Sequence, residues 1–151
     1  MRSIGPPEFC RETLERLYGL YNRREFIHPD PLEFVHQYPD SADREIVGLV
    51  ASSLAYGRVR QILKSVSDVL GRMGESPSKF ILDSPFSRIQ TVVGDFRHRF
   101  TGGGQMAALL YGIKRTIERY GSLQACFMAK CGHKDDTILP ALVGFVQELS
   151  A

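Results

Sequence analysis

The stretch SSLAYGRVRQI, residues 52–62, joins two helical patterns of different character. The pattern before it has apolar residues at intervals of three and four, the spacing of one helix face, at Ile46, Leu49, Val50 and Leu54. The pattern after it is a cleaner apolar stripe that begins at Val59, and Gly57 separates the two. The stretch therefore predicts a turn between a buried helix and an amphipathic helix that opens with Arg58 and Arg60.

The helical period extends over most of the chain, and no run shows the polar–apolar alternation of a half-buried strand. Glycine, proline and capping residues divide the pattern into segments. We expect helices at about residues 14–21, 31–35, 41–54, 59–74, 77–82 and 86–93, then between Gly104 and Gly121, after Ser122, and from 138 to 151. The chain is therefore predicted to be all-α.

Composition limits the class of protein. A length of 151 residues with 43% apolar content suits one globular domain, so residues 1–151 are expected to form a single domain. The 19 basic and 17 acidic side chains give a net charge of +2, so a surface that attracts a polyanion must come from clustering. The sequence has no long uncharged apolar run and a polar start, which argue against a membrane span or a secretory signal. Three cysteines are too few for a disulfide framework, so we expect free thiols and a cytoplasmic protein.

A resemblance to a known family rests on several short motifs: Asn22, the Pro29-Asp30-Pro31 turn, Asp43-Arg44-Glu45-Ile46, residues 53–57, Phe96-Arg97-His98-Arg99-Phe100, and the Gly121-Ser122-Leu123 corner before Phe127. In these motifs the chain from about Tyr21 to Ala151 resembles the N-terminal part of an uncharacterised bacterial family, domain of unknown function number 2400. The resemblance implies that residues 1–151 are the N-terminal portion of a longer family protein. Because the family is known only as a domain of unknown function, it implies no activity.

A looser resemblance is to the helical half of the helix-hairpin-helix DNA glycosylases. In those proteins a buried helix, a short polar turn, an amphipathic helix and an arginine-rich corner follow one another in the same order. The resemblance implies a compact multi-helix orthogonal bundle with DNA as partner. In that superfamily the turn after the buried helix faces the DNA and contributes a wedge residue, which corresponds here to Leu54, Ala55 and Tyr56. A Leu or Tyr side chain can fill an unstacked base step.

The chain departs from the glycosylases in the parts that perform catalysis. Those enzymes bind the DNA backbone through a Gly-containing hairpin and use an Asp, sometimes with a Lys, both of which would follow residue 151. Some members hold an iron–sulfur cluster with four closely spaced cysteines, whereas this chain has Cys10, Cys126 and Cys131. We therefore expect no cofactor and no catalytic constellation in these residues. If the full-length protein is an enzyme, the resemblance implies a glycosylase-like one.

Two pairs of arginines are the candidates for phosphate contact. Arg58 and Arg60 are predicted at a helix N-terminus, where free amides and the positive end of the helix dipole favour an anion. Arg97 and Arg99 precede Thr101 and three glycines, which could present backbone amides to an anion. The alternatives are a solvated helix face for the first pair and a flexible surface turn for the second. For Tyr56, the alternative to a DNA-facing role is a place in the core.

Other ionisable groups are better explained by structure than by chemistry. Cys126, Cys131 and His133 have a spacing similar to half of a metal site, but a buried Cys126 thiol is the simpler interpretation, and we expect no metal. Asp43 and Glu45 could form an acid–base pair, yet acidic residues are favoured near the start of a helix by its dipole alone.

The sequence thus supports two hypotheses. In the first, the chain is a DNA-binding helical domain in which six residues converge on one concave face: Leu54, Tyr56, Arg58, Arg60, Arg97 and Arg99. This hypothesis predicts salt-sensitive binding, and scattered arginines would contradict it. In the second, the chain is a non-catalytic protein-interaction module. Its uncovered apolar surface on residues 138–149 would then contact a second copy or the missing C-terminal part.

Overall fold

The computed structural model describes residues 10–132 and 136–150. In chain order the elements are α1 (Arg11–Tyr21), the short 3-10 helix η1 (Arg24–Phe26), α2 (Leu32–Val35), α3 (Ser41–Ser53), α4 (Val59–Met73), α5 (Pro77–Asp83), α6 (Phe86–Val93), β1 (Arg97–His98), β2 (Thr101–Gly102), α7 (Gly103–Tyr120), α8 (Leu123–Ala129) and α9 (Leu139–Ser150). The all-α prediction is confirmed. Each expected helix is present, and the strands of one two-stranded hairpin were not predicted.

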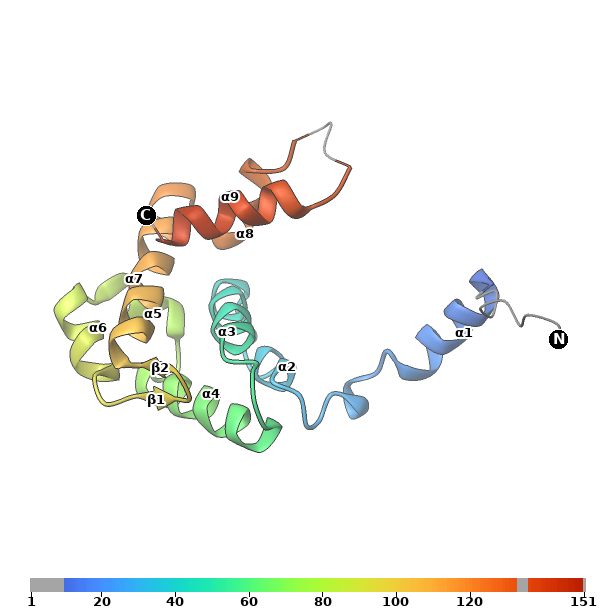
Figure 1. The fold of residues 1–151 in the computed structure, drawn as a ribbon, viewed down its shortest axis with the longest axis horizontal. Coiled ribbons are helices and arrows are strands. Elements are labelled where there is room, and N and C mark those ends of the chain that lie inside the picture. The colour runs from blue at the N-terminus through green and yellow to red at the C-terminus, as the bar shows by residue number, and fades with distance from the viewer. Residues whose placement is uncertain (1–9, 133–135, 151) are drawn as a thin grey trace, which may run out of the picture.

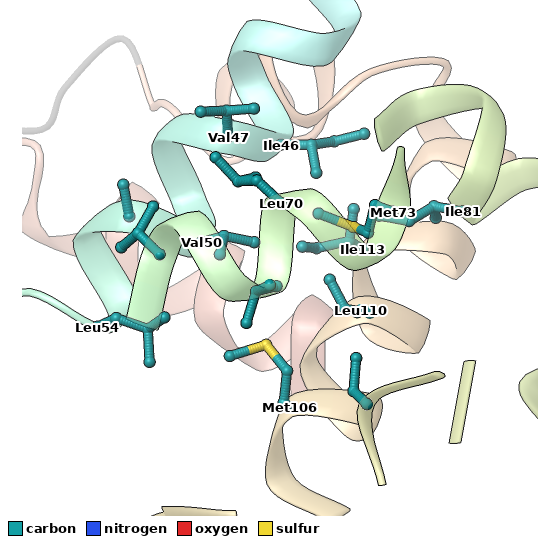
Figure 2. Close-up of a cluster of buried hydrophobic side chains, with 14 of the residues drawn as sticks. Ile46, Val47, Val50, Leu54, Leu70, Met73, Ile81, Met106, Leu110 and Ile113 are labelled. Carbon is teal, nitrogen blue, oxygen red and sulfur yellow. The ribbon is translucent and has the colours of Figure 1, made fainter. Parts of the chain in front are cut away.

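The core lies between α3, α4, α5, α6 and α7, and Figure 2 shows how side chains of α3, α4, α5 and α7 meet. The two patterns on either side of Gly57 both point inward, because α3 and α4 contribute the buried faces that the sequence predicts. The labelled core residues come from α3, α4, α5 and α7 and from Leu54, which directly follows α3: Ile46, Val47, Val50, Leu54, Leu70, Met73, Ile81, Met106, Leu110 and Ile113. By contrast, α1 buries none of its residues and projects away from the other helices (Figure 1).

Three carboxylates at the start of α3 have three different capping roles. Asp40 caps α3 itself, because its side chain accepts a hydrogen bond from the N–H of Ala42 at 2.8 Å. Asp43 is only 6% exposed and accepts hydrogen bonds at the start of α5, from Ser76 Oγ at 3.1 Å and Ser78 N at 2.8 Å. A buried carboxylate thereby satisfies donors that a helix start leaves free.

Glu45 does the same for α8. One of its carboxylate oxygens, Oε2, accepts from the backbone N–H groups of Leu123 and Gln124 at 2.8 and 3.3 Å. From the sequence, the dipole of their own helix is the expected reason for Asp43 and Glu45. The structure shows instead that both carboxylates lie at the positive ends of other helices, far along the chain.

The close approach of α9 to α7 depends on a glycine. A Cβ at Gly112 would lie 2.1 Å from the carbonyl oxygen of Leu149, so the backbones meet without a side chain between them. The end of α9 is further held by Glu148, whose carboxylate accepts hydrogen bonds from Lys130 Nζ at 2.7 Å, Tyr120 Oη at 2.9 Å and Arg119 Nη1 at 2.9 Å. These contacts fix α9 against the corner between α7 and α8.

Only one face of α9 is covered by these contacts. Phe145 and Leu149 pack against the core, but Ala141 is the one residue of the helix that is buried. The opposite face exposes Leu139, Leu142, Val143 and Val146. The predicted apolar surface on the last helix is therefore present.

Removal of the Asp43 charge tests the capping of α5. Ser76 Oγ and Ser78 N both donate to Oδ1, which Asn retains, but Asn lacks the negative charge that strengthens these hydrogen bonds at the positive end of α5. We therefore expect Asp43→Asn to lower the free energy of unfolding by about 1–3 kcal/mol. Urea unfolding followed by circular dichroism measures the effect. Asp83→Asn is the matched control, since Asp83 is exposed at the end of the same helix and its replacement should change stability by less than about 0.5 kcal/mol. Equal effects of the two substitutions would contradict the capping role.

The Glu148 network predicts a loss of stability in acid. The hydrogen bond from Lys130, and next that from Tyr120, lowers the pKa of Glu148 below its ordinary value of 4.5. A carboxylate with a lowered pKa in the folded state stabilises the fold above its unfolded pKa, and this contribution disappears as the pH falls through the lowered value. We therefore expect Glu148→Gln to be less stable than the unmodified chain at pH 7, with the difference shrinking as the pH is lowered from 5 to 2 in urea titrations. A difference that stays constant with pH would show that the charge of Glu148 contributes nothing.

Candidate nucleic-acid interface

The joint between α3 and α4 meets the hairpin of β1 and β2 at a buried histidine. His98 is 1% exposed, and both of its ring nitrogens have partners. Nε2 lies 3.1 Å from the carbonyl oxygen of Tyr56, and Nδ1 lies 2.9 Å from Ser65 Oγ on α4. A carbonyl oxygen can only accept, so Nε2 carries a proton and donates to Tyr56, and Nδ1 shares a second hydrogen bond with the serine hydroxyl. His98 thus fastens the hairpin both to the joint and to α4.

Tyr56 fastens the other strand. Its hydroxyl donates to the carbonyl oxygen of His98 at 3.2 Å and lies 2.6 Å from Thr101 Oγ1, which can donate to it. Its ring packs edge-on against the imidazole of His98, with centroids 4.7 Å apart. Tyr56 is half-buried. Tyr56 therefore holds the hairpin in place. This role fits the predicted alternative, a place in the core, better than an exposed contact with DNA.

Arg99 is packed against the joint on its outer side. Gly57 has a φ of +112°, and a Cβ there would lie 3.0 Å from both Cδ and Nη1 of Arg99. Arg99 itself has a φ of +51° in the two-residue turn between His98 and Thr101. The contact between Gly57 and Arg99 brings together two stretches that are about 40 residues apart in the sequence. Residues 56–60 and 97–101 together are called the joint–hairpin surface below.

The four arginines of the prediction all lie on this surface. Arg58 directly follows Gly57, Arg60 lies in the first turn of α4, and Arg97 is on β1 two residues before Arg99. All four are exposed, and within the described residues none has a carboxylate oxygen within 4.0 Å. The structure places Arg99 against Gly57, directly before Arg58. The convergence of all four arginines on one concave face stays a prediction.

Two carboxylates close to this surface are paired with a different arginine. Asp68 on α4 and Asp95 just before β1 both pair with Arg72. The hydrogen bond from Arg72 also lowers the pKa of Asp95 below its ordinary value, so this carboxylate stays ionised and committed to its partner. The first turn of α4 contains no acidic residue.

The remaining predicted residue, Leu54, is not on the surface. It is 1% exposed and belongs to the core, so its side chain is not presented to a ligand in this conformation. The residue that projects instead is Phe100, beside Arg99 in the turn, which is 86% exposed. The sequence analysis missed it because two-residue strands are too short to show alternation. An aromatic residue outside every helical stripe, between Arg99 and a Thr-Gly pair, was the available signal.

The glycine run after the hairpin serves packing rather than an anion. The N–H of Gly102 donates to Gln105 Oε1 at 3.0 Å. A Cβ at Gly103 would lie 2.3 Å from the carbonyl oxygen of Val93, so this glycine allows the start of α7 to touch the end of α6. The helix contact therefore explains Gly103, whereas a Cβ at Gly104 would meet nothing within 4 Å.

The cysteines and the described cavity lie away from this surface. Cys126 is buried, burial raises the pKa of its thiol, and all three cysteines are free. Within residues 10–132 and 136–150 no group of three His, Cys, Asp or Glu side chains could hold a metal ion; His133 lies outside them.

A mostly apolar cavity of about 650 Å³ lies between α3, α7 and α9, lined among others by Leu49, Leu109, Leu142, Phe145 and Val146.

The fold and the site define a helical protein with an arginine-bearing joint fastened to a hairpin. The chain belongs to the family described as "Protein of unknown function (DUF2400)", whose family profile matches residues 30–151. No curated protein and no solved structure matches the chain significantly. The first resemblance is therefore confirmed, and the comparisons give no support for the glycosylase resemblance. Among the described helices, none has the length and apolar character needed to cross a bilayer.

Replacement of Gly57 tests the packing of the joint against the hairpin. Ala at a φ of +112° is strained, and its Cβ would press on Arg99, so we expect Gly57→Ala to lower the free energy of unfolding by about 1–3 kcal/mol. Gly71→Ala in α4 is the control, because its Cβ would meet nothing within 4 Å and should raise stability by about 0.5–1 kcal/mol. Urea unfolding distinguishes the two signs, and a stabilised Gly57→Ala variant would refute the described joint.

Proposed function

We propose that the joint–hairpin surface binds DNA through its sugar–phosphate backbone. The observation that carries the proposal is the set of exposed arginines without carboxylate partners, held together by the Gly57–Arg99 contact. Phosphate contacts supply most of the affinity in non-specific DNA binding, and guanidinium groups pair with phosphate oxygens in a bidentate way. A fixed group of unpaired arginines therefore suits a polyanion better than a solvated helix face does.

The start of α4 supports the same ligand. Arg58 is its N-cap residue and makes no side-chain cap, so the first-turn amides have no side-chain acceptor from the cap position. Helix starts with free amides and a positive dipole end favour phosphate oxygens. The DNA glycosylases that the order of elements resembles also turn this joint toward DNA, which agrees with the proposal.

The backbone of Arg99 is a further argument. Two-residue hairpin turns commonly place glycine where φ is positive, because an L residue there costs about 1–2 kcal/mol. This hairpin places an arginine there instead, at a φ of +51°. Residues held in costly conformations concentrate at functional sites, so the strain supports a binding role for the Arg99 side chain.

The proposal covers binding and not a chemical step. The imidazole at this site is enclosed, and both of its nitrogens are engaged by Tyr56 and Ser65. A general base needs a free nitrogen within reach of the substrate. His98 is therefore part of the scaffold that presents the arginines.

A second candidate function is protein interaction through α9. Its exposed face, with Leu139, Leu142, Val143 and Val146, is apolar over consecutive turns, and such patches mark contact surfaces. This surface shares no residue with the joint–hairpin surface. The two functions can therefore be tested separately.

The DNA proposal predicts a salt-dependent affinity that relies on the arginines. For a labelled 20-base-pair duplex titrated in fluorescence anisotropy, log K should fall linearly with log salt, with a slope of about −0.9 per phosphate contacted. Arg58→Ala, Arg60→Ala should weaken binding and reduce the steepness of the slope by about 1–2, because two contacts are lost.

The matched control removes the same charge elsewhere. Arg11→Ala, Arg16→Ala takes two exposed arginines from α1, which projects away from the bundle, and should leave the slope unchanged. Equal weakening by both double variants would mean that only net charge matters. Absence of binding at low salt, with the protein shown to be folded, would reject the proposal and favour the interaction surface on α9.

A further inference from the structure

We infer that Phe100 stacks on an unpaired base of the bound nucleic acid, in a single strand or at a defect of a duplex. The inference rests on the proposed function, since the arginines must first hold the backbone. Phe100 is 86% exposed, more than any other large apolar side chain in the described residues, the next being Ile138 at 70%. Phe96, at the other end of the same short run, is 2% exposed. The core accommodates Phe96 but not Phe100, so the turn accounts for the outward position of Phe100.

The turn holds Phe100 in a fixed position. The residues on either side of the Arg99–Phe100 pair are tied down, His98 by Tyr56 and Ser65, and Thr101 by the Tyr56 hydroxyl. Figure 1 shows the hairpin at the edge of the bundle, beside α4. A ring on an anchored two-residue turn needs little ordering when it binds, so its contact energy is not lost to entropy.

The surroundings of the ring favour a base over a protein partner. The guanidinium carbon of Arg99 lies 5.7 Å from the centre of the Phe100 ring, and Arg97 is two residues from Arg99 on β1. A protein-docking site usually has several apolar side chains in one patch, as α9 does. A single ring among cations is instead the combination found where bases stack and phosphates are held on either side.

An unpaired base is a better stacking partner for Phe100 than a paired one. In a regular duplex the base faces are covered by their neighbours, and opening a step costs a few kcal/mol. At a bulge or in a single strand a face is already free. The surface should therefore bind such DNA more tightly than a matched duplex, and the difference should depend on the ring of Phe100.

The test compares three DNAs of the same length and sequence: a matched duplex, a duplex with one bulged base, and the single strand. Anisotropy titrations at one salt concentration use the unmodified chain, Phe100→Ala and Phe100→Trp. The control Tyr18→Ala removes an exposed aromatic residue from α1. Thermal unfolding verifies that each variant is folded.

The unmodified chain should prefer the bulged duplex, the single strand or both over the matched duplex. Phe100→Ala should weaken binding to the preferred DNA by about 5- to 150-fold, the range that loss of one base–aromatic stack produces, and leave the matched duplex within twofold. Phe100→Trp and Tyr18→Ala should keep the preference. Which of the two DNAs is preferred identifies the source of the unpaired base.

Two other outcomes overturn the inference in different ways. Arginine-dependent binding without a preference, or an equal loss by Phe100→Ala on all three DNAs, refutes the stacking role and leaves the proposed function standing. Failure of the unmodified chain to bind any of the DNAs at low salt refutes both.

Discussion

The pair of carboxylates near the start of α3 is the constraint on which the rest of the structure depends. Asp43 and Glu45 lie on neighbouring turns of one helix, and each accepts the free N–H groups of another helix start. These contacts join α3 to α5 across 35 residues and to α8 across 78 residues. A carboxylate at the positive end of a helix is favourable in both position and hydrogen bonding, and its loss leaves buried donors without partners. Since α3 ends at the joint, the same contacts fix where the joint leaves the bundle.

The ion pairs explain how a chain of net charge +2 carries a basic surface. Several acidic side chains are engaged in holding the fold: Asp43 and Glu45 at helix starts, Asp68 and Asp95 with Arg72, and Glu148 with Lys130, Tyr120 and Arg119. The arginines near Gly57 are not drawn into these pairs. The sequence total therefore conceals a local excess of positive charge, because the fold separates charges that composition adds together.

Helix positions were predictable because they depend on local signals. Asp40, Ser76 and Ser122 cap the helices that follow them, and Gly74 and Gly121 stop those that precede them. The joint and its arginines were predictable for the same reason. The partners of Asp43 and Glu45 were not, because they lie tens of residues away and no spacing rule connects them. The hairpin was missed because each of its strands is two residues long. Leu54 was assigned to the surface by the glycosylase resemblance, although the helix period had already placed it on the same apolar face as Ile46 and Val50.

The position of α7 explains how two surfaces can coexist on a small chain. The helix begins at the hairpin with Gly103 and ends at the corner held by Glu148, and its 18 residues span about 27 Å at 1.5 Å per residue. Gly103 lets its start touch α6, and Gly112 lets its middle touch α9. The contacts along α7 thus place the joint–hairpin surface near one end and α9 along the other half (Figure 1). An occupant of the α9 face would leave the arginines free, so binding of a nucleic acid and of a protein partner are compatible on this fold.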